Sequence, residues 1–302
     1  MTTEEMILLW LSEKKPYVKE STLAQYRRTL RKVLIKECHL FDCEDFNEAS
    51  CNKIINYITK QYTPKSLRNA IIILNQFFNF AFNQNIISVP IHLDVKILGA
   101  KSQKIQIMKA SEQREFTRFL ADNTDSSKLG ILICLYTGLR LGEICSLQWK
   151  DIDFKNQSIR ISKTVQRISD GSGSTYFLVS HPKTECSERE IPIPSFLFKF
   201  IKEMNKHSDE TCYIATGTNN FLQPRTYQNR LKSYLKRCGL PCYHFHTLRH
   251  TFASRAIELG VDIKALSEIL GHSSTKITLD LYVHPSMEHK KKELQKLSIL
   301  FK

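Results

Sequence analysis

The chain has 302 residues, which is long enough for two domains that each bury a hydrophobic core. Hydrophobic residues make up 42% and charged residues 25%, and no apolar run reaches the length of a membrane span. We therefore expect a cytoplasmic protein that makes no use of a membrane. The net charge of +14 favours a polyanionic partner such as nucleic acid, although a basic protein without such a partner fits the charge too.

Residues 1–88 predict a bundle of four helices. Thr2 and Glu5 form a capping-box pattern before the first helix, and the second follows Ser21. The third spans Asn47–Lys60, and Pro64 opens the fourth. Basic side chains on the second helix and in the first turn of the fourth are either a solvated surface or DNA contacts; they are Arg27, Arg28, Arg31, Lys32, Lys65 and Arg68.

Residues 89–109 predict an extended basic linker, because they contain Pro90, Gly99 and several lysines without a clear period. If two domains gripped opposite faces of a duplex, Lys101 and Lys104 would lie near phosphates. A plain surface linker is the alternative.

Residues 110–302 predict a mostly helical domain with a small antiparallel sheet. The expected strands are Ile152–Phe154, Ser158–Ile161, Tyr176–Val179 and Arg189–Ile193, separated by turns rich in glycine and serine. Residues 287–302 form a basic amphipathic tail that would pack either on its own domain or on a neighbouring copy. The fold class is therefore mainly α, with a helical first domain and a mixed α+β second domain.

Several residues of the second domain suit displacement at a phosphodiester. Arg140 and Arg249 each precede or begin an expected helix, and a guanidinium matches two phosphate oxygens. Lys183 follows His-Pro in a turn between two expected strands, from which it could protonate a leaving oxygen. Taken alone, each of these side chains fits an ordinary surface position.

Two histidines and a tyrosine complete this set. His246 lies three residues before Arg249, and His272 follows Gly271 at an expected helix end. Tyr282 would be the nucleophile, although its neighbours Leu281 and Val283 also fit a half-buried core tyrosine. Read singly, each histidine fits a structural role.

Metal and cofactor chemistry finds little support in the sequence. His244, His246 and His250 have no cysteine or carboxylate at zinc-ligand spacing. The nine cysteines are scattered without a Cys-x-x-Cys pair, and Cys134, Cys145 and Cys186 fit small buried hydrophobic positions. A P-loop and a carboxylate pair for two-metal cleavage are also missing, so we expect a reaction without cofactors.

Taken together, the motifs resemble those of the tyrosine recombinase (phage integrase) family. Four boxes match in order: Tyr136-Thr-Gly-Leu-Arg-Leu-Gly-Glu-Ile144, His181-Pro-Lys-Thr184 continuing to Ser187-Glu-Arg-Glu-Ile-Pro-Ile193, His246-Thr-Leu-Arg-His-Thr-Phe252, and Leu270-Gly-His272 with Tyr282. The resemblance implies that a 3′-phosphotyrosyl bond forms at Tyr282. It also implies that the scissile phosphate is surrounded by Arg140, Lys183, His246, Arg249 and His272. Glu143 and His250 match supporting positions.

The resemblance further implies a core-binding domain at 1–88, a catalytic domain at 110–302 and four protomers joining two DNA sites. Such a protein would be a monomer when free and would work with accessory or excision factors. The expected absence of an arm-binding domain points towards the simpler members of the family, which are Xer-like resolvases of chromosome or plasmid dimers, inversion recombinases and short integrases of mobile elements. Gly142-Glu143 and Trp149-Lys-Asp-Ile-Asp153 look more like the element-borne integrases and rank these slightly ahead. A type IB topoisomerase-like enzyme and a non-catalytic DNA-binding protein stay open as alternatives.

Overall fold

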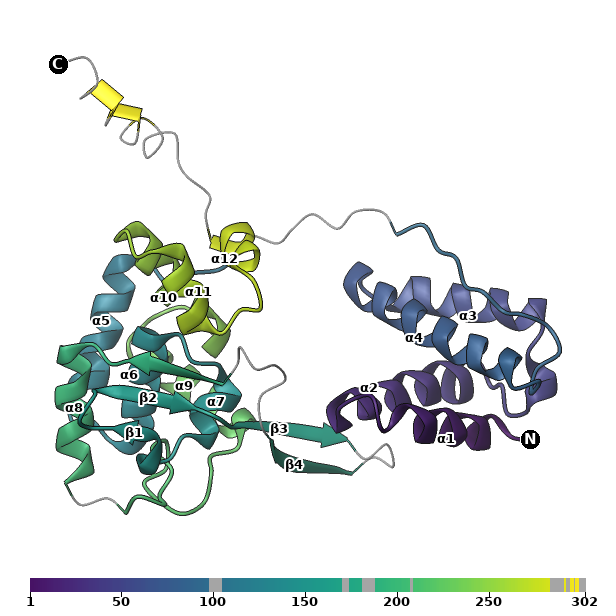
Figure 1. The fold of residues 1–302 in the computed structure, drawn as a ribbon, viewed down its shortest axis with the longest axis horizontal. Helices are drawn as coiled ribbons and strands as arrows, with labels where there is room; N and C mark the ends of the chain where they lie inside the picture. Colours follow the sequence, from purple (N-terminus) through teal and green to yellow (C-terminus); the bar gives the residue numbers. More distant parts are fainter. Residues whose placement is uncertain are drawn as a thin grey trace. The chain divides into compact units, whose positions relative to one another are not determined.

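A computed structural model describes residues 1–97, 105–169, 174–180, 188–206 and 209–282, together with residues 291, 294–295 and 297–298. The chain splits into two compact units. The first comprises Met1–Gln103 and Arg167–Tyr176, and the second comprises Lys104–Gln166 and Phe177–Lys302 (Figure 1).

The first unit is a helical bundle. Its elements are α1 (Thr3–Lys14), α2 (Glu20–Leu30), the π-helical η1 (Arg31–Glu37), the short 3₁₀-helix η2 (Cys43–Asp45), α3 (Glu48–Gln61) and α4 (Pro64–Asn83). Thr2 caps α1 and exchanges hydrogen bonds with Glu5. At the centre of the bundle, the ring of Trp10 packs edge-on against Phe77 at 5.8 Å between centroids.

The first half of the predicted linker packs on this bundle. Ile91 and Leu93 are buried in its core. Asn75 on α4 fixes Leu93, because its side chain bonds the Leu93 backbone N–H at 2.8 Å and the carbonyl at 3.0 Å. Alternate apolar residues, which the prediction overlooked in favour of the lysines, explain this packing. Lys101 and Lys104 lie outside the described residues.

The second unit combines helices with a three-stranded sheet, and a separate two-stranded sheet has residues in both units. The helices are α5 (Ala110–Ala121), α6 (Ser126–Thr137), α7 (Leu141–Ser146), η3 (Trp149–Asp151), α8 (Ser195–Asn205), α9 (Pro224–Arg237), α10 (Phe245–Glu258), α11 (Ile263–Leu270) and α12 (Thr275–Tyr282). β1 (Ile152–Asp153), β2 (Ser158–Ile161) and β5 (Arg189–Pro192) form an antiparallel sheet in the order β1-β2-β5, with Ile159 opposite Ile191. β3 (Thr164–Ser169) and β4 (Thr175–Ser180) pair separately. The predicted fold class, mainly α with a small antiparallel sheet, is confirmed.

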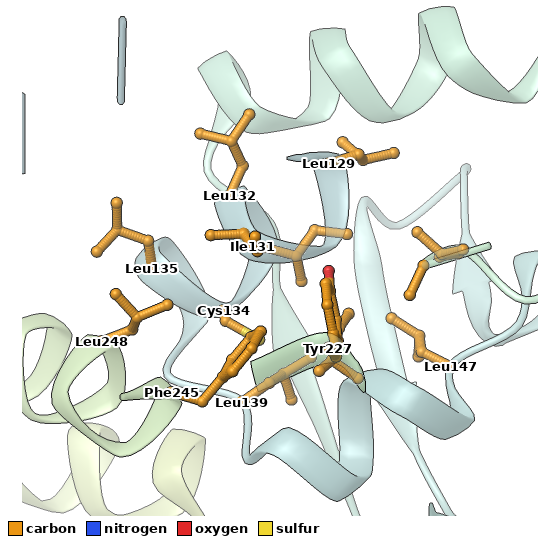
Figure 2. Packing of buried hydrophobic residues seen from close by; sticks show 14 of the residues in the cluster. Leu129, Ile131, Leu132, Cys134, Leu135, Leu139, Leu147, Tyr227, Phe245 and Leu248 are labelled. Carbon is orange, nitrogen blue, oxygen red and sulfur yellow. The ribbon is translucent and has the colours of Figure 1, made fainter. Parts of the chain in front are cut away.

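Helix α6 lies in the hydrophobic core of the second unit. It is apolar on every side, and Figure 2 shows Leu129, Ile131 and Leu135 pointing into different parts of the core. A helix with no polar face is stable only when neighbours cover it completely. The hydroxyl of Tyr227 on α9, also in this core, donates to the Ser127 carbonyl at 2.8 Å. The prediction that Cys134 and Cys145 are buried is confirmed, and Cys186 lies outside the described residues.

Candidate active site

The end of α6 places the first arginine of the candidate site. Gly138 ends the helix in the left-handed conformation with φ +69°, and a Cβ there would lie 2.6 Å from the Phe252 ring. The chain then turns into α7, where the Glu143 carboxylate accepts the Arg140 backbone N–H at 2.8 Å. Glu143 also holds the Arg140 guanidinium, with 2.8 Å between Nη1 and Oε1. The Tyr136–Ile144 motif therefore folds into a local clamp around one guanidinium.

Helix α10 places the second arginine. His246, Arg249 and His250 are three and four residues apart, so they share one side of the helix. Arg249 is 2% exposed, and its two terminal nitrogens donate to the carbonyls of Gly138 at 2.8 Å and Leu270 at 2.6 Å. Arg249 thus joins the ends of α6 and α11.

Arg189 is a site residue that the sequence analysis quoted in a motif but gave no role. It lies on β5, and its guanidinium bonds both oxygens of Glu143, at 3.0 and 2.9 Å. Its Nε also donates to the Ile269 carbonyl at 2.6 Å. Arg189 lies two residues before the buried Ile191, so both side chains are on the same face of β5. An arginine at an inward-facing position of a strand was therefore the signal in the sequence that could have indicated a role for Arg189.

His272 lies directly after the left-handed C-cap Gly271 of α11. Its Nδ1 is 2.8 Å from the hydroxyl of Thr278, which is fully buried on α12. This contact engages one ring nitrogen and leaves Nε2 for a ligand. The Gly271 carbonyl accepts Arg140 Nη2 at 3.0 Å, so His272 and Arg140 are fixed by adjacent backbone groups.

Tyr282 ends α12 and is 8% exposed in a small core with Ala253, Leu266 and Leu270. Its hydroxyl lies 2.7 Å from His250 Nδ1. Its ring is parallel to that of His272, with 6.4 Å between centroids and 4° between planes. Figure 1 shows α12 beside α10 and α11, the helices that carry these histidines. The position of Tyr282 fits both a core tyrosine and a nucleophile, because its ring is buried while its hydroxyl faces the candidate site.

The site carries an excess of positive charge. Three guanidinium groups, those of Arg140, Arg189 and Arg249, surround the one carboxylate of Glu143. Burial and the charges of Arg249 and Arg140 lower the pKa of His272 to about 4. Burial, His246 and Arg249 likewise lower the pKa of His250 to about 4, so both rings are neutral at pH 7. A partly buried site of this kind favours an anion, and a phosphodiester supplies one.

Glu143 is a carboxylate that stays ionised despite deep burial. Burial raises its pKa, but the hydrogen bonds and charges of Arg189 and Arg140 outweigh that effect and leave the pKa below its usual value. Tyr282 behaves in the opposite way. Burial raises the pKa of its phenol, and the charges of Arg249 and Arg140 offset only part of that rise. The tyrosine is therefore neutral at pH 7 in the absence of substrate.

The structure brings Arg140, Glu143, His250, Arg249, His272 and Tyr282 into one cluster, linked by hydrogen bonds and by the ring contact of His272 with Tyr282. His246 adjoins it, since its ring meets that of His250 edge-on at 4.8 Å. Lys183 lies outside the described residues.

The predicted DNA contacts lie on the first unit. Arg28 and Lys32 are exposed and line a groove between α2 and α4 with Ser66 and Asn69. The Lys32 ammonium lies over the Tyr62 ring at 5.4 Å. The remaining four differ in exposure: Lys65 and Arg68 are exposed, Arg27 is partly buried, and Arg31 is bound to Glu4.

Neither a metal cluster nor a membrane helix is found within the described ranges. No group of three or more histidine, cysteine or carboxylate side chains could hold a metal ion there. None of the described helices is long and apolar enough to cross a bilayer.

Comparison with known proteins agrees with this geometry. The sequence model of the phage integrase family matches residues 100–289, which is more than half of the chain. The chain belongs to the phage integrase family. The chain is 30% identical over 273 residues to a XerC-like tyrosine recombinase of Caldanaerobacter subterraneus subsp. tengcongensis, covering 83% of the chain and 69% of the relative. It is 28% identical over 248 residues to the ICEBs1 integrase of Bacillus subtilis, covering 78% of the chain and 66% of the relative.

Several solved structures share the fold of this chain. The Tn1549 transposon integrase in complex with transposon right end DNA superposes with a TM-score of 0.76 at 21% identity, over 99% of this chain and all of that one. A lambda integrase tetramer bound to a Holliday junction gives a TM-score of 0.66 at 17% identity, over 93% of this chain and 77% of that one. The family match and the XerC-like relative show that the chain is an enzyme of the tyrosine recombinase class, which breaks and rejoins DNA strands.

Proposed function

We propose that the chain is a site-specific recombinase that cuts and reseals DNA of a mobile element through a phosphotyrosyl bond at Tyr282. One observation carries the proposal: the Tyr282 hydroxyl is held at 2.7 Å from His250, in a cluster whose buried Arg249 and half-exposed Arg140 are fixed by backbone carbonyls. Such donors need no rearrangement when negative charge develops on a phosphate. The related transposon and ICEBs1 proteins support the mobile-element assignment.

The reaction needs nothing beyond the protein and DNA. The Tyr282 oxygen attacks phosphorus, the bond to the 5′-oxygen breaks, and the DNA stays attached through a 3′-phosphotyrosyl ester. Arg140, Arg249 and the Nε2 atom of His272 would neutralise the non-bridging oxygens, and Lys183 would protonate the leaving oxygen. Reversal of these steps with another 5′-hydroxyl rejoins the strands, so neither ATP nor a metal is required.

The assignment of the nucleophile is tested with Tyr282→Phe. Genomic DNA of the cell that encodes the protein is fragmented and incubated with the chain, and DNA still attached after boiling in detergent is sequenced. We expect the wild type to retain particular sites and Tyr282→Phe to retain none, since phenylalanine has no hydroxyl to esterify. Tyr234→Phe, at a partly buried tyrosine on α9 that packs against Phe119 and is not part of the cluster, is the matched control. Covalent DNA on Tyr282→Phe would refute the assignment.

The sequences recovered in this way also separate two subtypes. Sites at the ends of an element that contains the gene support integration or excision, with an excision factor as a partner. A single chromosomal or plasmid site supports a dimer resolvase, the alternative favoured by similarity to the XerC-like relative. Relaxation of a supercoiled plasmid that lacks the site would instead support a topoisomerase.

The wider assembly follows from the same proposal. We infer that residues 1–88 form a core-binding domain and 110–302 a catalytic domain, which together hold double-stranded DNA in the cytoplasm. The exposed Arg28 and Lys32 would contact phosphates from the first domain. The tetramer of lambda integrase on a Holliday junction supports four protomers on two sites. We expect a monomer when the protein is free of DNA. Mass photometry with and without the recovered site tests both states.

A further inference from the structure

Among the described residues, the Tyr282 hydroxyl has His250 and the guanidinium of Arg249 as side-chain hydrogen-bond partners, and of these two the histidine can accept a proton. His250 Nδ1 lies at 2.7 Å from it, and the two rings are 5.4 Å apart between centroids, tilted by 55°. His272 stacks against the same tyrosine, but its Nδ1 is engaged by Thr278. His246 contacts His250 through its ring. His250 is therefore the group within reach of the phenolic proton.

That proton must leave during the reaction. Burial raises the pKa of Tyr282, so the phenol is protonated at neutral pH, and an ester cannot form until the O–H bond breaks. A general base takes a proton at hydrogen-bond distance, directly or through one water. His250 meets the distance requirement, and it is neutral at pH 7. A neutral imidazole that carries its proton on Nε2 accepts at Nδ1.

We propose that His250 is a catalytic residue that takes the Tyr282 proton on Nδ1 during cleavage and returns it during rejoining. The inference rests on the proposed phosphotyrosyl function. In the cleavage step the Tyr282 O–H bond breaks and its proton passes to His250, while the new oxygen–phosphorus bond forms and the 5′-oxygen leaves. No electron is gained or lost, and the reverse step restores the neutral histidine.

Binding of DNA would strengthen His250 as a base. In the free protein, burial and the cations around the ring hold its pKa at about 4. The groups that face it are His246 and Arg249 from α10, Tyr282 from α12 and, beyond the tyrosine, His272. A bound phosphodiester adds a negative charge among these cations and raises the basicity of the imidazole. The proton transfer is thus favoured when substrate is present.

The test compares His250→Asn with a control substitution, first with tyrosine and then with a fluorinated tyrosine at position 282. A nicked duplex made from a site recovered with the wild type is used under single-turnover conditions, and the covalent adduct is measured. His250→Asn should slow cleavage by about 10²-fold or more, which is the range of general-base catalysis. His244→Asn is the matched control and should cleave like the wild type, because His244 is exposed, lies six residues before His250 and makes no side-chain hydrogen bond to cap α10.

A fluorinated tyrosine at position 282 then separates proton transfer from packing. Fluorine lowers the phenol pKa, so the oxygen depends less on a base. We expect fluorotyrosine to restore most of the cleavage lost in His250→Asn and to change the wild type little. The same fold-change in both backgrounds would mean that His250 only packs against the ring, and it would overturn the inference.

The failure of the inference differs from the failure of the proposed function. If the wild type yields no covalent adduct on any genomic DNA, the phosphotyrosyl function fails. If the wild type forms the adduct and His250→Asn forms it equally fast, only the role of His250 fails. If His246→Asn, rather than His250→Asn, is rescued by fluorotyrosine, the neighbouring histidine is the base and the inference is again overturned.

Discussion

The carboxylate of Glu143 should contribute more to the stability of the second unit than any surface ion pair. It is 4% exposed and accepts hydrogen bonds from two guanidinium groups and one backbone N–H. Glu143→Gln keeps the shape of the side chain but removes the charge and turns an NH₂ group towards an arginine. Breaking a buried pair by altering one partner costs about 3–5 kcal/mol, because the other charge stays buried without compensation.

Urea unfolding can measure this cost in the second unit by itself. The chain has two tryptophans, and Trp149 lies in the core of the second unit, so a Trp10→Phe background leaves one probe. With a slope of about 2–3 kcal/mol per M, the midpoint should fall by about 1–2.5 M. Glu188→Gln is the matched control, because the Arg160–Glu188 pair is 72% and 48% exposed. A pair of that exposure contributes about 0–1 kcal/mol.

The effect should also depend on pH with a definite sign. The folded-state pKa of Glu143 lies below its ordinary value of 4.5. Its contribution is therefore complete above pH 4.5 and is lost as the pH falls through the folded-state pKa. The gap between the wild type and Glu143→Gln should be largest at pH 7 and close under acid. A gap no larger than that of Glu188→Gln, or one that widens under acid, would refute the reasoning.

Two further substitutions test the other supports of the site. Thr278→Val removes the hydroxyl that engages His272 Nδ1, and it should slow adduct formation about fivefold, since one hydrogen bond is worth about 1 kcal/mol. The exposed Thr275→Val is its control, and equal rates would exclude the role of Thr278. Arg249→Lys removes the planar fork that bonds two carbonyls, so single-turnover cleavage should fall by about 10²–10³ while gel-shift affinity stays near that of the wild type. Exposed Arg237→Lys is its control, and unchanged cleavage would contradict the assignment.

Sequence periodicity predicted which helices and strands carry the site. It predicted the contacts between the side chains of the site less well. His246, Arg249 and His250 share one side of a helix by spacing alone, and the glycines before Arg140 and His272 marked the helix ends. These signals are local, so they can be read without a structure. The strand β3 was missed because its buried residues, Val165 and Ile168, are three apart and do not alternate.

Contacts between distant segments left weaker signals. Arg189 meets Glu143 from 46 positions away, and Thr278 meets His272 across the turn between α11 and α12. The spacing of His246 and His250 does not indicate which of the two side chains faces Tyr282. The family resemblance implied only a supporting role for His250. Residues 89–109 were predicted to be an extended linker because of their lysines. The burial of Ile91 and Leu93 was not predicted, since it depends on the surface of α4.

The arrangement of backbone carbonyls explains how a cluster of like charges stays folded before any DNA arrives. The left-handed caps Gly138 and Gly271 have φ of +69° and +63°, and their carbonyls accept Arg249 and Arg140. The negative ends of these peptide dipoles, with Glu143, offset repulsion between the guanidinium groups. A residue with a Cβ would strain both turns, and at Gly138 it would also meet Phe252 at 2.6 Å. The two glycines therefore set the positions of the cations, and through them the charge that Tyr282 experiences.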